Sequence, residues 1–372
     1  MKNPKLRILL SISLITCISM AACQKSPDTI TTSSSVVSSY IPTTEALEIT
    51  YDDSDSSYEA DIDTIDLDNA SEDITITEEG SFLITGSAAD LMILVDASED
   101  DEVHLILKDA MITNSDAATI LILSAGKVKI TLEGDNILTG GENSGTYEGD
   151  DIDGVIWSQT DLTLNGDGSL TVTSPAAHGI ACKGDMVIAG GSYGIESCND
   201  GIHVDGSLLI ADGDISIVSG DDGIHADSIL QIDSAEAEIT AAEGLESTNV
   251  IINEGNITIY ASDDGINAAQ KDDEHIPAVI INGGNITIDM EQGDTDGIDS
   301  NGDIIINGGT IIINGPSPCD YDTTALFYGG TLIINGEETD TIPSQFTGGM
   351  GPEGRGGVPE GGMIPPNQGR PY

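Results

Sequence analysis

The sequence predicts an all-β protein built as a single-stranded parallel β-helix, a solenoid in which three short strands make up each coil. Three observations predict this fold. The dipeptide Gly-(Ile/Leu/Val) recurs between Gly154 and Gly297 at spacings of 25, 22, 22, 21, 21 and 32 residues. Ile, Val and Leu dominate this part of the chain, while aromatic residues make up only 3% of the whole. Asn-Gly pairs, which supply the left-handed backbone of tight corners, separate the apolar runs.

Each coil contains three apolar segments. The first starts at the repeated Gly-Ile, the second is an apolar run that ends in Asn-Gly, as in 279–283, and the third reads Asn-Ile-Thr-Ile, as in 256–259. Alternation in the third segment places Ile inside and Thr outside. Stacked at about 4.8 Å, roughly a dozen such coils are expected. A leucine-rich repeat needs a Leu frame that is absent here, and a β-sandwich does not explain the fixed period.

The N-terminus has the features of an export signal. Three basic residues precede an apolar stretch, 6–18, that is too short to span a bilayer. Small residues then precede Cys23. This pattern predicts a bacterial lipoprotein signal peptide over 1–22 and a lipid on Cys23. The alternative is an ordinary cleaved signal followed by a chance cysteine. The lipoprotein interpretation predicts an extracellular protein that meets the cell membrane only through its lipid anchor.

The rest of the chain divides into three parts by composition. Residues 23–60 are rich in Ser and Thr and are expected to be a flexible tether. Residues 61–345 are expected to form the β-helix, with the less regular stretch 61–141 as a β-rich N-terminal cap. Residues 346–372 are rich in Gly and Pro and are expected to be disordered.

The charge of the chain excludes several classes of partner. The sequence has 65 acidic and 11 basic residues, a formal net charge of −54. Nucleic acids and anionic lipid surfaces need basic patches, so neither is an expected partner. Such strong self-repulsion opposes a compact state unless something neutralises it, and we expect a monomer.

Acidic residues recur at the offset of the repeat itself. In a β-helix, equivalent positions of successive coils lie over one another, so these carboxylates would form a column with like charges about 5 Å apart. Clustered hard oxygen ligands suit Ca²⁺, which we expect between Asp222 and Glu243 or Glu246, and between Glu243 and Asp264. The alternative is a solvated acidic edge without an ion. The candidate ligands are Asp200, Asp221, Asp222, Glu243, Glu246, Asp263, Asp264, Asp296 and Asp299.

The same residues carry a resemblance to a known family. The segments Ser219–Asp227, Ala242–Ser247 and Ala261–Ala268 resemble the bacterial carbohydrate-binding β-helix proteins, which are secreted or lipid-anchored and related in fold to pectate lyases. The upstream segments Thr75–Gly86 and Val103–Ala110 are similar to the N-terminal portion of that family. The resemblance implies a right-handed parallel β-helix, calcium in the acidic column, and binding of cell-wall polysaccharide such as cellulose or polygalacturonate.

Three functions remain open from the residues. A binder of polysaccharide would use calcium to bridge acidic sugars, or the hydrogen-bonding face of the sheet at Thr258, Thr287 and Asn267 to hold neutral ones. The candidate rings for stacking on a sugar are Trp157, Tyr193 and Tyr260. A pectate lyase-like enzyme needs a basic side chain to take a proton, but the body has no Arg, and acidic neighbours should raise the pKa of Lys271. A polygalacturonase-like hydrolase needs an acid and a base carboxylate, which Asp221 and Asp222 could supply, but the sequence lacks the Arg-x-Lys substrate clamp of those enzymes. The third function is a structural surface adhesin or spacer. We expect a non-catalytic binder.

Overall fold

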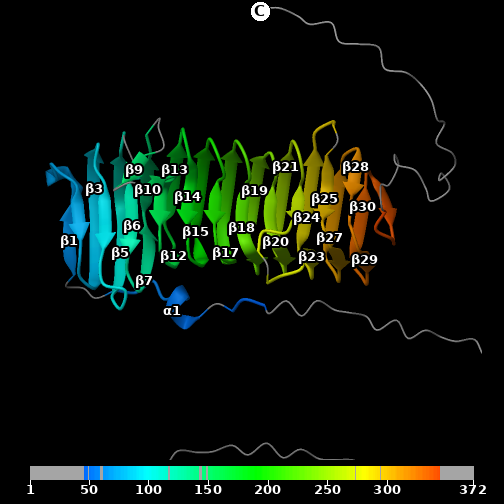
Figure 1. Ribbon diagram of the computed structural model, residues 1–372, viewed down its shortest axis with the longest axis horizontal. Coiled ribbons are helices and arrows are strands. Elements are labelled where there is room, and N and C mark those ends of the chain that lie inside the picture. The colour runs from blue at the N-terminus through cyan, green and yellow to red at the C-terminus, as the bar shows by residue number, and fades with distance from the viewer. Residues whose placement is uncertain are drawn as a thin grey trace, which may run out of the picture. The chain divides into compact units, whose positions relative to one another are not determined.

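The computed structural model describes residues 46–48, 50–58, 62–115, 118–141, 145–147, 150–272, 274–293 and 295–343. Their strands form three parallel stacks, and the chain winds through them for about 11 turns (Figure 1). The prediction of an all-β parallel solenoid is confirmed. In the described part of the chain, helix is limited to α1 (Tyr51–Ser54) and the 3-10 turn η1 (Leu67–Asn69).

Several long strands turn a corner and serve two stacks. The first stack contains β2 (Ile74–Ile76), β4 (Ile93–Asp96), β6 (Ile120–Ser124), β11 (Gly154–Ser158), β14 (His178–Cys182), β16 (Ile202–Val204), β18 (Ile224–Ile232), β20 (Leu245–Ile252), β22 (Ile266–Ala268), β25 (Asp296–Ser300) and β28 (Ser317–Cys319). The second contains β1 (Asp63–Asp66), β3 (Gly80–Ala89), β5 (Glu102–Thr113), β7 (Lys127–Glu133), β12 (Leu162–Gly166), β15 (Met186–Ser197), β17 (Leu208–Ser219), the ends of β18 and β20, β23 (Ala278–Ile281), β26 (Asp303–Ile306) and β29 (Thr324–Phe327). The third contains the ends of β3, β5, β15 and β17, with β8 (Asp135–Thr139), β13 (Ser169–Ser174), β19 (Glu236–Ala241), β21 (Asn256–Ala261), β24 (Asn285–Met290), β27 (Thr310–Asn314) and β30 (Thr331–Ile334).

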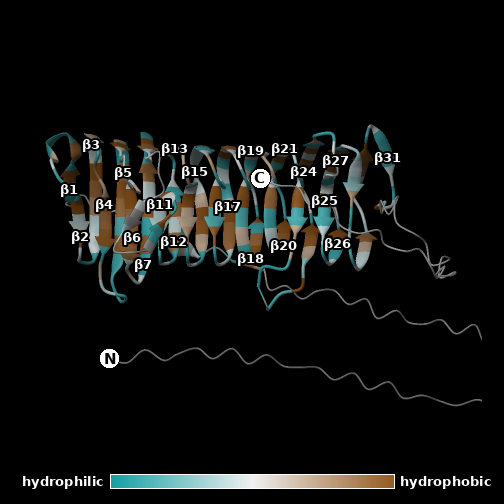
Figure 2. Cartoon of the chain, turned by 45° about the horizontal axis from the view of Figure 1, so that its top comes forward, coloured by the Kyte–Doolittle hydropathy of each residue, from teal (hydrophilic) through white to brown (hydrophobic). Residues whose placement is uncertain are grey.

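The register of the stacks places like residues over one another. In the first stack one aliphatic residue of each coil lies over that of the next, in the order Ile202, Ile224, Leu245, Ile266 and Ile298. All five side chains are fully buried. Figure 2 shows the resulting alternation of hydrophobic and hydrophilic residues along the strands. The interior is therefore a continuous aliphatic core, which explains why so few aromatic residues are needed.

The N-terminal region is part of the solenoid. Residues 62–141 are rich in strands, as expected, but β1 to β8 continue the three stacks in parallel register instead of forming a separate cap. An antiparallel hairpin, β9 (Gly145–Tyr147) and β10 (Asp150–Ile152), projects from the coils. At the other end β31 (Glu337–Thr339) pairs antiparallel with β30 and covers its edge.

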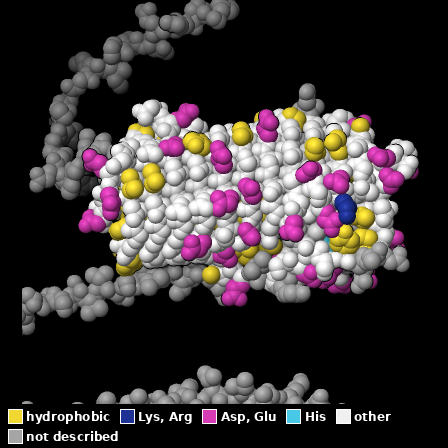
Figure 3. Space-filling model, turned by 180° about the vertical axis from the view of Figure 1, so that it is seen from behind, with side chains coloured by type: hydrophobic (Ala, Val, Ile, Leu, Met, Phe, Trp, Pro, Cys, Tyr) yellow, Lys and Arg dark blue, Asp and Glu magenta, His cyan; other side chains and the backbone are white. Residues whose placement is uncertain are grey.

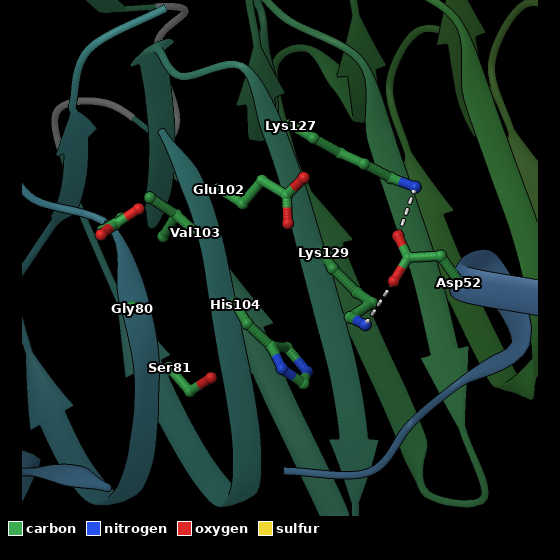
Figure 4. Close-up of a pocket in the computed structure, with 9 residues that line it drawn as sticks. Asp52, Gly80, Ser81, Glu102, Val103, His104, Lys127 and Lys129 are labelled. Atoms are coloured by element: carbon green, nitrogen blue, oxygen red, sulfur yellow. Dashed lines mark hydrogen bonds and ion pairs between the residues drawn. The ribbon is translucent and has the colours of Figure 1, made fainter. Parts of the chain in front are cut away.

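A segment before the first strand packs on the outside of the second stack. The backbone of Leu47 exchanges two hydrogen bonds with the Gln231 side chain, of 2.8 and 2.9 Å. Asp53 accepts hydrogen bonds from Lys127 at 2.7 Å and from Thr163 at 3.1 Å. Figure 4 shows Asp52 of α1, whose carboxylate lies 2.9 Å from Lys127 Nζ. We call Leu47–Tyr58 the N-terminal strap. Its described residues lie in the range expected to be a free tether, yet they are bound to the solenoid.

Acidic side chains cover much of the surface. Figure 3 shows them scattered along one face of the coils, with a single small patch of basic residues. Among the described residues, no helix has the length and apolar character needed to cross a bilayer.

Candidate functional site

Two rows of outward-facing residues run along the first stack. The acidic row consists of the residues that precede the last five repeated glycines: Asp200, Asp222, Glu243, Asp264 and Asp296. Each is stacked on the next through a backbone hydrogen bond from the following Gly. The second row, which we call the flanking row, follows each repeated Ile or Leu and consists of His203, His225, Glu246, Asn267 and Asp299. The predicted column of stacked carboxylates is therefore present.

Three carboxylates meet at the centre of the two rows. Asp222, Glu243 and Glu246 each place a carboxylate oxygen within 4.8 Å of the other two. Asp222 and Glu246 are buried, with 7% and 6% of their surface exposed. Like charges at this distance repel strongly once water is excluded, so the cluster requires protons or cations.

Internal cations neutralise one end of the cluster. The His225 Nδ1 atom lies 2.7 Å from Glu246 and 3.1 Å from Asp222, and Lys271 Nζ lies 2.5 Å from Glu246. Burial alone would lower the pKa of His225, but hydrogen bonds to these carboxylates raise it to about 10. Burial alone would raise the pKa of Glu246, but the same partners lower it. At this end the positive charges are already built into the chain.

The other end of the cluster has acids without such partners. Burial, followed by the charges of Glu246 and Asp222, raises the pKa of Glu243 to about 8. Burial, followed by the charges of neighbouring aspartates, raises the pKa of Asp264 to about 7 and that of Asp299 to about 6. Without a cation, these carboxyls hold protons at a pH where free carboxyls have lost them.

Asn267 lies between these uncompensated acids. Its Nδ2 atom donates to Glu243 at 2.8 Å, and its backbone pairs with Asp299 on the next coil. The Oδ1 atom is buried and has no hydrogen-bond partner. Turning the amide over would exchange its two ends and direct this oxygen at the carboxylates, where it is unfavourable unless a cation lies between them. Carboxylate and amide oxygens are ligands that Ca²⁺ prefers, so this group fits calcium.

The structure separates the other candidate ligands. Asp200 lies at the histidine end of the acidic row, beside His178 and His203. Asp296 accepts a hydrogen bond from Ser317 at the far end of the row. Asp221 and Asp263 each precede a row residue by one position, and both are exposed. Their side chains belong to neither row.

The three aromatic candidates have different surroundings. Tyr193 is 2% exposed in the aliphatic core, and its hydroxyl donates to the Gly190 carbonyl at 2.8 Å. Trp157 is 4% exposed under the β9–β10 hairpin, with its indole N–H bonded to Asp153. Neither ring can stack on a sugar in this arrangement. Tyr260 is 43% exposed and remains the candidate among the three. Cys23 lies outside the described residues.

Tyr260 lines a shallow cleft of about 440 Å³ at the corner after the third stack. Thr240 and Asp289 lie on the neighbouring strands in register with it, and Glu291 and Ser262 complete the polar lining. One aromatic ring with hydroxyl and carboxylate neighbours is an arrangement suited to a sugar ring.

Sequence reasoning undervalued the basic and amide residues of the site. The imidazoles of His178, His203 and His225 stack, with centroids 4.5 and 4.6 Å apart. His203 and His225 are 22 residues apart, the period of the repeat, and this spacing could have identified them. Asn267 was expected on one face with Thr258 and Thr287, which lie in the third stack. It lies instead in the first stack, two coils beyond His225 at the equivalent position.

In the presence of a chelator, which removes bound metal, the protein should lose stability as the pH rises from about 5 to about 8. Glu243, Asp264 and Asp299 have folded-state pKa values above their unfolded values, so the folded chain binds protons that the unfolded chain releases. Their contribution to stability is complete below the unfolded pKa values and is lost as the pH passes the folded ones. Thermal melting in the presence of a chelator measures this. Glu243→Gln should flatten the decline above about pH 6.5, and a melting temperature that rises over this interval would contradict the assignment.

Comparisons with known proteins bear on the family of the chain. The curated relative, a carbohydrate-binding domain-containing protein of Acetivibrio thermocellus, is 36% identical over 143 residues, which is 36% of this chain and 49% of the relative. The chain thus spans about half the length of the curated relative it matches. A solved polysaccharide lyase-like protein from C. thermocellum, a gadolinium derivative, aligns with 26% identity over 73% of this chain and 95% of its own, with a TM-score of 0.41. A family model for carbohydrate-binding domain-containing proteins matches residues 70–243 and 221–326. The chain therefore belongs to the family of carbohydrate-binding domain-containing proteins.

Proposed function

We propose that this protein binds cell-wall polysaccharide at the bacterial cell surface, that the binding depends on calcium, and that it is not catalytic. Membership of the carbohydrate-binding family supports the class of ligand. The observation that carries the calcium dependence is the Asn267 side chain: its buried Oδ1 atom has no partner, and its Nδ2 atom donates to Glu243, which forms no ion pair among the described residues. The lipoprotein signal that the sequence before Cys23 predicts supports the location.

Calcium belongs at the uncompensated end of the cluster. Glu243, Asn267 and the neighbouring Asp264 and Asp299 offer carboxylate and amide oxygens. At the other end, His225 pairs with Asp222 and Glu246, and Lys271 pairs with Glu246. Ca²⁺ takes six to eight oxygen ligands, so an ion held at this partly open edge keeps positions for water or for a ligand. A uronate carboxylate can fill those positions, which explains how an acidic protein binds an acidic polysaccharide such as polygalacturonate.

A neutral polysaccharide such as cellulose would bind elsewhere. The exposed ring of Tyr260 and the hydroxyl of Thr240 lie in a cleft that contains no member of the two rows. Stacking on the ring does not require calcium. Binding of the two polysaccharides is therefore separable by mutation.

Pull-down on insoluble polygalacturonate and on cellulose, with calcium or with chelator, tests the proposal. Glu243→Gln and Asn267→Leu should weaken polygalacturonate binding at least about tenfold, whereas Asp221→Asn, the same kind of charge loss on an exposed neighbour, should leave it unchanged. Tyr260→Ala should reduce cellulose binding alone. Binding to neither polysaccharide would remove the proposal and favour the surface spacer.

The enzymatic alternative depends on Lys271. A lyase base must be neutral at the working pH. Burial alone would lower the pKa of Lys271, but its hydrogen bond to Glu246 and the nearby Glu243 and Asp222 raise it, so this amine stays protonated. An absorbance assay for unsaturated uronate ends detects a lyase directly, and the binder predicts no signal.

A further inference from the structure

The histidine end of the two rows has a different chemistry from the calcium end. His178 Nδ1 lies 3.2 Å and His203 Nδ1 lies 2.7 Å from the same oxygen, Asp200 Oδ2. Asp200 and both imidazoles have little exposure, with side chains 5%, 12% and 22% exposed. Two imidazole nitrogens and one carboxylate oxygen therefore converge at a point that is shielded but not sealed.

We propose that His178, Asp200 and His203 form a binding site for a borderline divalent metal ion such as Zn²⁺, separate from the calcium site. Imidazole nitrogen suits zinc and its neighbours in the transition series, whereas Ca²⁺ prefers all-oxygen sites. Three protein ligands with a fourth position for water form a common tetrahedral zinc set.

The two distances from the imidazole nitrogens to the Asp200 oxygen suit such an ion. At bond lengths of about 2.05 Å, tetrahedral ligands lie about 3.3 Å apart. The separations of 3.2 and 2.7 Å need only a small expansion around the ion. Binding would displace the proton that His203 Nδ1 shares with Asp200 and the hydrogen bond from the Asp200 N–H to His178. The ion therefore has to replace two hydrogen bonds, and the proton of a neutral His203 moves from Nδ1 to Nε2, which faces Asp205.

A second set of contacts holds each ligand from behind. The His203 Nε2 atom lies 3.3 Å from Asp205, which Lys183 holds at 3.2 Å, and the His178 Nε2 atom faces Asp153 at 3.9 Å. Metal-bound histidines usually donate their other ring N–H to a carboxylate in this way. The second oxygen of Asp200 accepts from the backbone of Asp222 at 3.1 Å, which leaves Oδ2 for the ion.

Zinc titration of the full chain with saturating calcium present tests the site. One Zn²⁺ should bind per chain, as measured by isothermal titration calorimetry. His178→Ala and His203→Ala should each weaken binding at least about 100-fold, and Asp205→Asn by about 10–100-fold. His275→Ala is the matched control, because His275 pairs with Asp272 away from the rows, and it should change nothing.

Spectroscopy separates this site from the calcium site. With Cu²⁺ as a probe, electron paramagnetic resonance should show two nitrogen ligands in the native protein and one in each histidine variant. Calcium affinity should stay unchanged in both variants, which also shows that they are folded. The proposal is overturned if no stoichiometric zinc binds over saturating calcium, if both histidine variants bind it as tightly as the native chain, or if Glu243→Gln abolishes zinc binding.

Discussion

Saturating calcium should raise the melting temperature of this protein at about pH 8 by about 5–10 °C. An ion that binds only the folded chain adds about 2.7 kcal/mol at a concentration of 100 times its Kd. For a large domain, each kcal/mol shifts the midpoint by about 2–4 °C. The gain should shrink towards pH 5, because burial raises the pKa values of Glu243 and Asp264 and protons then compete with the ion.

Two adjacent aspartates provide a matched pair for this experiment. Asp264 lies in the acidic row, whereas Asp263 is exposed one position earlier. Asp264→Asn should remove most of the calcium gain, and Asp263→Asn should keep it, although both remove one charge from the same turn. An equal gain in the two variants would mean that calcium only screens surface charge, and no gain in the native chain would remove the calcium site.

The second large effect is expected at the repeated glycine. A Cβ atom added to Gly244 would lie 2.4 Å from the Gly265 carbonyl oxygen on the next coil and 2.4 Å from Cγ2 of Ile259 in the core. Both contacts are far below van der Waals distance, and neither neighbour can move without breaking the stack. Gly244→Ala should therefore destabilise the fold by about 3 kcal/mol or more, at the upper end of overpacking effects.

Gly194→Ala is the control for this substitution. A Cβ at Gly194 meets no atom within 4 Å, so this variant should keep a native melting temperature within a few degrees. Chemical denaturation of the two variants, compared with the native chain, gives the difference in free energy of unfolding. A Gly244→Ala variant as stable as Gly194→Ala would show that the coils are less tightly stacked at this corner.

The sequence was sufficient to predict the solenoid because the repeat can be read directly from the spacing of residues along the chain. Gly, Ile and the acids recur together, so the stacking of Asp222 on Glu243 and Asp264 followed from counting. The spacing of the repeat does not determine which way a side chain points at the corners, because the inside–outside alternation of the strands is interrupted there. Asp221 and Asp222 are adjacent, yet one is exposed and the other buried. For the same reason Tyr193 looked available to a sugar but lies in the core.

The partners of the site depend on long-range contacts that a repeat does not encode. Lys271 comes from an insertion that interrupts the period, and its ion pair with Glu246 appears only when the coils are wound. The N-terminal strap has a composition typical of a flexible segment. Its attachment depends on Lys127, Thr163 and Gln231, which no local pattern connects to it.

The N-terminal strap changes how the solenoid is expected to come apart. In a simple stack each coil touches only its neighbours, so the ends can fray one turn at a time. The strap is bound to Gln231 through Leu47 and to Glu133 through Tyr58, and so it connects coils that are otherwise not in contact. Loosening any one of the spanned coils then strains the others, which should make the middle of the rod open as one cooperative block, while the coils after β20 peel away independently.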